Sequence, residues 1–185
     1  MAKRSAHKKQ QTRQAGRVLE RLLPRNSVHR VAAVFVLLLA VLLPLALFSA
    51  GWSGWGPITG AIAATAGAAS RLVGLPVVVQ GNLMQLPSRT LAVDPQCTAV
   101  DLLVVYAALV LAYPIAWKKR LLALATGAAV LEVINIFRLV GVAWASEVLA
   151  DRQFTLVHDY LFEFGMVFVV MMMWAVALSV AKQNA

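Results

Sequence analysis

The sequence predicts an all-α polytopic membrane protein: four transmembrane helices, an interfacial or re-entrant helix on the outer face, and a short β-hairpin before the only cysteine. Hydrophobic residues make up 61% of the 185 residues, more than a soluble domain of this size can bury. Four apolar stretches have the length of a bilayer-crossing helix, and the segment before the first is strongly basic. These observations indicate that lipid surrounds most of the chain.

The formal net charge of +9 is unevenly distributed, because nine of the 17 Lys and Arg residues lie in residues 1–30 beside a single acid, Glu20. We predict a basic cytoplasmic arm over residues 1–30 and a single membrane-embedded catalytic domain over residues 31–185. A basic arm directly before an apolar span suits anionic headgroups better than nucleic acid, so membrane lipids are expected as partners and nucleic acid is not. The basic region is too long for a cleavable signal peptide, so the first span is expected to be retained.

The first predicted span covers residues 31–50, and twenty residues at about 1.5 Å each match a hydrocarbon core of about 30 Å. Pro44 is expected to kink this helix, and Trp52 and Trp55 follow it as an interfacial aromatic belt would. Residues 57–74 are apolar but rich in Ala and Gly. Small residues recur there at a spacing that usually means close helix packing: Gly60, Ala64, Gly67 and Ala68.

The segment before the cysteine has the pattern of a β-hairpin. Residues 77–79 and 91–93 are short apolar runs, and turn residues lie between them at 81–82 and 87–88.

Three further spans are predicted over residues 97–117, 121–142 and 158–180, and the basic residues 118–120 connect the first two. The positive-inside rule places both the basic arm and this basic connection in the cytoplasm. If residues 57–74 crossed the membrane, the connection would face the outside, so this segment is expected to remain on the outer side. Both termini are then cytoplasmic. The outer ends of three different helices carry Cys97, Arg138 and His158, so these three side chains are expected at one membrane depth.

Each of these residues has a functional and a structural interpretation. Cys97 is either a small apolar residue or a nucleophile whose pKa is lowered by a helix N-terminus and nearby positive charge. Arg138 either extends to the headgroups or stabilises a developing negative charge, and His158, the only histidine outside the arm, is either idle or a general base. Asp101, one helical turn after Cys97, is expected to pair with Arg138. Asn135 lies three residues before Arg138, on the same face of the predicted helix.

A single cysteine excludes an internal disulfide, a CxxC redox pair and a zinc site built on cysteines. We expect no metal and no cofactor.

The order of these residues resembles the exosortase/archaeosortase family, and the short length resembles its compact exosortase H type. The β-like segment ends at Cys97, "NIFR" places Asn135 and Arg138 late in a later span, and His158 opens the last span. The resemblance covers residues 75–164, about half of the chain.

The family's cysteine motif is usually Cys-Ser-Gly, and here it is Cys97-Thr98-Ala99. The resemblance implies a bacterial inner-membrane enzyme, with its active site on the outer face, that cleaves proteins bearing a C-terminal sorting signal: a short motif, a transmembrane helix and a basic cluster. It also implies that Cys97 forms a thioester, that Arg138 stabilises the oxyanion, and that His158 transfers the proton. Water or an amine-bearing acceptor would then release the product.

Other functions remain open at this point. A non-catalytic membrane module that binds a partner helix or a lipid headgroup would use Arg138 and the small-residue segment equally well. A third hypothesis is an acyltransferase whose nucleophile, Cys97, acts on a lipid. A rhomboid-type serine protease is disfavoured, because no serine lies in a Gly-x-Ser-x-Gly setting.

Overall fold

The computed structural model describes residues 27–49, 51 and 53–183. The predicted basic arm lies outside these residues, except that residues 27–30 already belong to the first helix, α2 (Ser27–Ser49). Trp52 also lies outside the described residues. Trp55 donates a hydrogen bond from its indole nitrogen to the carbonyl of Ser49 at 2.6 Å, which ties the end of α2 to the segment that follows.

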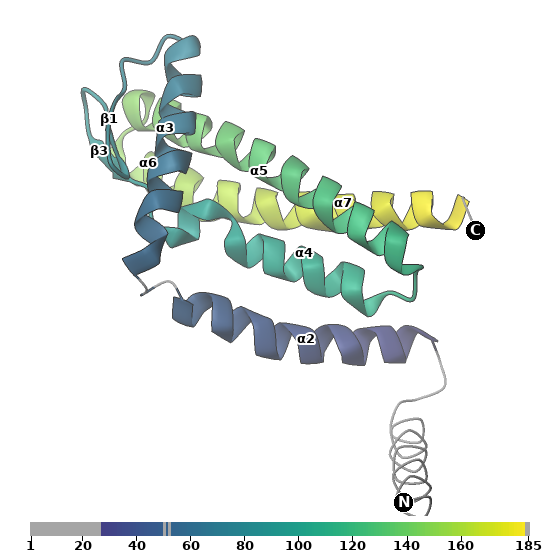
Figure 1. Ribbon diagram of the computed structural model, residues 1–185. Coiled ribbons are helices and arrows are strands. Elements are labelled where there is room, and N and C mark those ends of the chain that lie inside the picture. Colours follow the sequence, from purple (N-terminus) through teal and green to yellow (C-terminus); the bar gives the residue numbers. More distant parts are fainter. Residues whose placement is uncertain (1–26, 50, 52, 184–185) are drawn as a thin grey trace, which may run out of the picture.

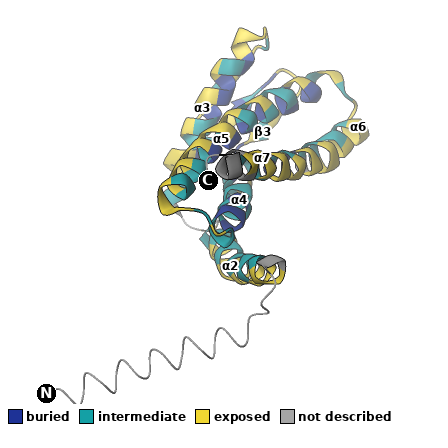
Figure 2. Cartoon of the chain, turned by 90° about the vertical axis from the view of Figure 1, so that its right-hand side faces the viewer, coloured by how far each residue is buried: buried dark blue, intermediate teal, exposed yellow. Residues whose placement is uncertain are grey.

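The body of the molecule is a bundle of helices that run side by side (Figure 1). Its members are α2, α4 (Val100–Ala112), α5 (Trp117–Val148) and α7 (Glu163–Gln183). The short α4 contacts each of the three longer helices. Large apolar side chains remain exposed along the long helices, as expected for surfaces that face lipid (Figure 2); examples are Val36, Leu37, Phe48, Phe137, Phe164 and Phe168.

Among the described residues, three helical stretches are long and apolar enough to cross a membrane: His29–Ser49, Trp117–Val148 and Asp151–Ala177. They agree with three of the four predicted spans. The remaining one, predicted over residues 97–117, is a helix of only 13 residues, or about 20 Å against a hydrocarbon core of about 30 Å. The predicted count of four spanning helices is therefore not confirmed.

Two backbone features limit the length of α4. Before it, Ala99 adopts a left-handed conformation with φ 53° and ψ 19°, which interrupts the helix between Cys97 and α4. After it, Tyr113 is extended (φ −83°, ψ 135°), because Pro114 disfavours a helical conformation at the preceding residue.

Two helix boundaries also differ from the prediction. The basic residues 118–120 lie in the first turn of α5 and not in a connecting loop, since Lys and Arg are good helix formers. The last helical stretch starts earlier than predicted, with α6 (Asp151–Leu156) and a π-helical turn (Val157–Phe162) before α7. Asp151 favours this earlier start, because an acidic residue in the first turn complements the helix dipole. His158 consequently lies within a helical stretch and not at its beginning.

At one end of the bundle, α3 (Gly56–Leu72) runs transverse to the long helices (Figure 1). It packs on an antiparallel sheet of order β1 (Val78–Gln80), β2 (Leu83–Gln85) and β3 (Thr90–Ala92). The prediction contained the two outer strands but not β2, whose single buried residue, Met84, gives too little apolar pattern for recognition. The position of α3 relative to lipid remains a prediction.

The glycines of the predicted small-residue segment pack against this sheet. A Cβ atom at Gly67 would overlap the side chain of Val79, and one at Gly60 would lie 3.6 Å from the carbonyl oxygen of Gly81. Ala64 and Ala68 are exposed, so the predicted close packing applies to the glycines alone.

The resulting core joins α3, the sheet and α5 beneath the segment that carries Cys97: Ala63, Ala66, Met84, Val93, Leu139 and Ala143.

Candidate active site

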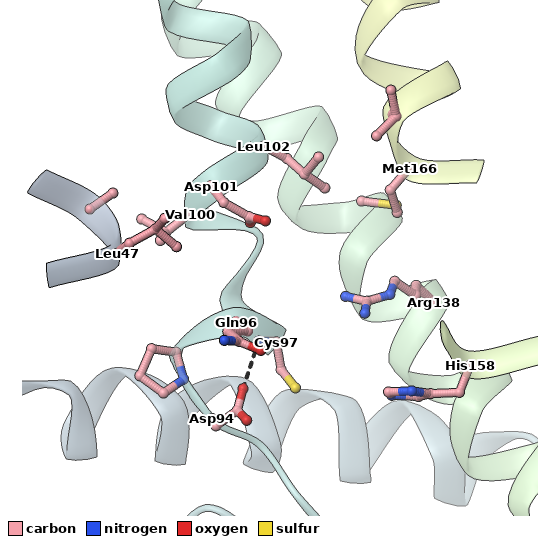
Figure 3. A pocket seen from close by; sticks show the side chains of 13 residues that line it. Leu47, Asp94, Gln96, Cys97, Val100, Asp101, Leu102, Arg138, His158 and Met166 are labelled. Carbon is pink, nitrogen blue, oxygen red and sulfur yellow. Dashed lines mark hydrogen bonds between the residues drawn. The ribbon is translucent and has the colours of Figure 1, made fainter. Parts of the chain in front are cut away.

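A cavity of about 330 Å³ lies where the ends of α2 and α4 meet α5 and the start of α7, within the size range of about 300–1,000 Å³ typical of small-molecule sites. Cys97, Arg138, His158 and Asp101 all line it. Figure 3 shows the sulfur, the guanidinium and the imidazole directed into the same space from different elements. The sequence predicts one membrane depth for these three side chains but not their convergence, and the tertiary structure brings them to one cavity.

A short 3₁₀ turn, Pro95–Thr98, holds Cys97 in place. The Asp94 carboxylate caps this turn by accepting a hydrogen bond from the backbone N–H of Cys97 at 3.1 Å. Thr98 closes the turn by donating from its hydroxyl to the carbonyl of Pro95 at 2.6 Å. The left-handed Ala99 then redirects the chain into α4. An Asp-Pro pair is a recognisable start signal, so Asp94 could have been identified from the sequence.

Burial raises the pKa of the Cys97 thiol above its ordinary value, and the charge of the adjacent Asp94 raises it further. Arg138 and a hydrogen bond to the backbone of Asp94 act in the opposite direction without outweighing burial. The predicted lowering of this pKa is therefore wrong, because Cys97 lies in a partly buried turn beside a carboxylate and outside the first turn of α4. The resting residue is a thiol, and it needs a base to become a nucleophile.

Asn135 connects the cysteine turn to α5. Its side chain is completely buried and donates to the carbonyl of Cys97 at 2.9 Å. Its oxygen accepts a hydrogen bond from Nη1 of Arg138 at 3.4 Å, as the three-residue spacing of the two side chains on one helix face allows. Asn135 thereby orients both the backbone of Cys97 and the guanidinium of Arg138.

Asp101 does not pair with Arg138, contrary to the prediction. Its Oδ1 is buried without a hydrogen-bond partner, and so is Nε of Arg138. The prediction assumed one continuous helix from Cys97 to Asp101, and the left-handed Ala99 breaks that helix. Figure 3 shows the Asp101 carboxylate and the Arg138 guanidinium entering the cavity from separate helices.

His158 is held by two contacts. Its Nδ1 lies 2.7 Å from Oδ1 of Asp159, and its ring stacks on Phe154 with 5.6 Å between centroids. The guanidinium of Arg89 lies over the Phe154 ring, 4.5 Å from its centroid, and Arg89 is paired with Asp151 at 3.2 Å. This stack links the turn between β2 and β3 to the imidazole.

Sequence reasoning did not identify Phe154 or Asp159 as part of the site. Phe154 lies four residues before His158 and shares its helix face, so the spacing carried a usable signal. Asp159 is the next residue in the chain, and adjacent residues on a regular α-helix do not face each other. Their contact occurs in the π-helical turn, a geometry that is frequent at functional sites.

Within the described part of the chain, no group of three or more His, Cys, Asp or Glu side chains is arranged to hold a metal ion.

A family model described as a transmembrane exosortase matches residues 22–178 of the 185. The match includes the cysteine turn, α5 and the π-helical turn, and hence every residue of the cavity described above. No match was found among curated proteins, and none among solved structures.

Proposed function

Because the chain belongs to the transmembrane exosortase family, we propose that it is a membrane cysteine peptidase or transpeptidase that cleaves C-terminal sorting signals of exported proteins. The observation that carries this proposal is the convergence of Cys97, Arg138 and His158 on one cavity. These side chains provide a nucleophile, an oxyanion donor and a general base, the set of groups that acyl transfer needs.

Because the pKa of the Cys97 thiol is raised, the first step needs a base, and His158 in the same cavity is the proposed one. Nδ1 of His158 donates to Asp159, which leaves Nε2 as the base. Nε2 takes the proton from Sγ while Sγ bonds to the carbonyl carbon of the substrate, and the carbonyl electrons move to its oxygen. The guanidinium of Arg138 stabilises that oxyanion.

Collapse of the tetrahedral intermediate breaks the C–N bond. His158 then gives its proton to the leaving amine, and a thioester on Cys97 remains. In the second half-reaction, water or an amine acceptor gives a proton to Nε2 and attacks the thioester, and the thiol is regenerated.

The proposed setting is the bacterial inner membrane, with both termini cytoplasmic and the cavity at the outer face. The proposed substrates carry a short C-terminal motif, a transmembrane helix and a basic cluster. The apolar side chains of α2 and α7 beside the cavity support access from the bilayer, since Leu47, Met166 and Val167 line it together with Cys97.

The test is to co-express the full chain with an exported reporter that ends in such a signal, taken from a protein of the same organism. Wild type is expected to remove the C-terminal peptide and to carry a hydroxylamine-sensitive acyl group on Cys97, detected by mass spectrometry. Cys97→Ala should abolish both signals. The exposed Thr65, remote from the cavity, provides the control Thr65→Ala, which should leave them unchanged.

Cleavage that survives Cys97→Ala, with the variant in the membrane at normal abundance, would reject the cysteine mechanism. If the reporter is also cleaved in cells that lack the chain, another enzyme cuts it and the non-catalytic module is the better account.

A further inference from the structure

The cavity contains two buried polar atoms of opposite character that have no partner. Oδ1 of Asp101 can only accept a hydrogen bond when ionised, and Nε of Arg138 can only donate one. Buried polar groups are nearly always satisfied in proteins, so two unsatisfied atoms that line one cavity point to a ligand that satisfies them. The proposed mechanism uses Arg138 for the oxyanion and leaves Asp101 without a task.

Asp101 lies deeper in the bundle than the nucleophile. It belongs to the first turn of α4, which leads away from the cysteine turn toward the opposite end of the bundle (Figure 1). Apolar side chains from three helices surround it in the cavity: Leu47, Leu102 and Met166. A carboxylate in this position faces whatever passes from the cysteine into the apolar layer.

A polypeptide that enters the apolar layer must form a helix, because no water is available there for its backbone. The N–H groups in the first turn of that helix have no partner within it and form the positive end of the helix dipole. Asp is among the best residues at capping such N–H groups.

We propose that Asp101 caps the amino-terminal end of the substrate's transmembrane helix, just after the bond that Cys97 attacks. This inference rests on the proposed function and assigns the substrate-binding role that the mechanism leaves open. A helix start fixed at Asp101 determines which upstream peptide bond reaches Cys97. It also keeps that bond outside the helix, where its carbonyl is accessible to Arg138.

The first test compares two substitutions with the same reporter. A neutral amide also caps helices, so Asp101→Asn should keep kcat/KM within about threefold, whereas Asp101→Leu should lower it about tenfold. Neither variant should lower the thermal stability, because the buried Oδ1 of Asp101 has no hydrogen-bond partner in the protein. An equal loss in both variants would overturn capping and favour recruitment of an ammonium group by the carboxylate charge.

A proline scan through the first helical turn of the reporter identifies the capped N–H group, since proline lacks this donor. With the wild-type enzyme, proline at one position of the reporter should reduce its cleavage. With the Asp101→Leu enzyme, proline at that position should cause no further reduction. Additive losses would contradict a direct contact.

The second test does not require cleavage. In the variant Cys97→Ala/Asp101→Cys the only thiol is at position 101, because Cys97 is the sole cysteine of the chain. Reporters with one cysteine at successive positions should form a disulfide with it most efficiently at the first turn of their transmembrane helix. A maximum elsewhere, or no crosslink, would overturn the inference. A crosslink at the expected position, together with no cleavage of the reporter by the wild-type protein, would reject only the proposed chemistry.

Discussion

The side-chain amide of Asn135 donates a hydrogen bond to the carbonyl oxygen of Cys97 at 2.9 Å, across 38 residues of sequence. Asn135 is 0% exposed, so water cannot reach its side-chain amide in place of the Cys97 carbonyl. This bond anchors the cysteine turn to the helix that carries Arg138. It gives the Asn-x-x-Arg spacing a structural reason, because one side chain holds the nucleophile's backbone and also accepts from the guanidinium.

We expect Asn135→Asp to lower the free energy of unfolding by about 1–3 kcal/mol, because an ionised carboxylate cannot donate to the Cys97 carbonyl. Reporter cleavage should fall as well. Thermal unfolding in detergent and the cleavage assay measure the two effects. Thr126, exposed on the same helix, provides the control Thr126→Ala, which should change neither. Unchanged stability of Asn135→Asp would mean that the bond contributes nothing to folding.

The left-handed Ala99 predicts that Ala99→Gly stabilises the protein. A residue with a Cβ atom at φ 53° is destabilised by about 1–2 kcal/mol, and glycine adopts this conformation without that cost. Part of the gain is offset by the larger entropy of glycine in the unfolded chain. Thermal unfolding should therefore show an increase of about 1 kcal/mol.

The matched control is Ala108→Gly, at a buried position inside α4. It should destabilise by about 1 kcal/mol or more, since glycine is unfavourable in a helix interior. Destabilisation by both glycines would contradict the left-handed assignment.

The reactivity of Cys97 should depend on pH in a specific way. Because burial raises the pKa of its thiol, alkylation by iodoacetamide should continue to accelerate above pH 9.0, the ordinary value. Asp94→Asn removes a negative charge and should move the midpoint to lower pH. Arg138→Gln removes a positive charge and should move it to higher pH.

The sole cysteine makes total alkylation a measure of this one site, and Cys97→Ala gives the blank. A midpoint below pH 9.0 in wild type would indicate a preformed thiolate. His158 would then not be needed for the first proton transfer.

Removal of the aromatic support should weaken the positioning of His158. Phe154→Leu loses both the stack on the imidazole and the contact with Arg89, and an aromatic pair contributes up to about tenfold in an equilibrium. We expect kcat to fall by about this factor, because the imidazole loses its support, while Phe154→Tyr restores it. An equal loss in the two variants would show that ring stacking is not the cause.

Much of the architecture followed from local sequence. Three apolar stretches were long enough to span a bilayer by themselves, and no tertiary contact was needed to identify them. The outer strands and the position of Cys97 beside them also followed from short-range patterns. Two features that the sequence did not predict are also local. Strand β2 has too few apolar residues to be recognised, and nothing in the sequence indicates that Ala99 adopts a φ of 53°.

By itself, the sequence indicated which residues could do chemistry, namely Cys97, Arg138 and His158. Only the tertiary structure decided that Cys97, Arg138 and His158 line one cavity, that Asp101 remains unpaired, and that Phe154 and Asp159 hold the imidazole. The physical reason is that helices that are apolar on every side carry no pattern that specifies their rotation about their own axes. That rotation is set by packing, here by the α4 contacts with α2, α5 and α7 and by the hydrogen bond from Asn135 to Cys97.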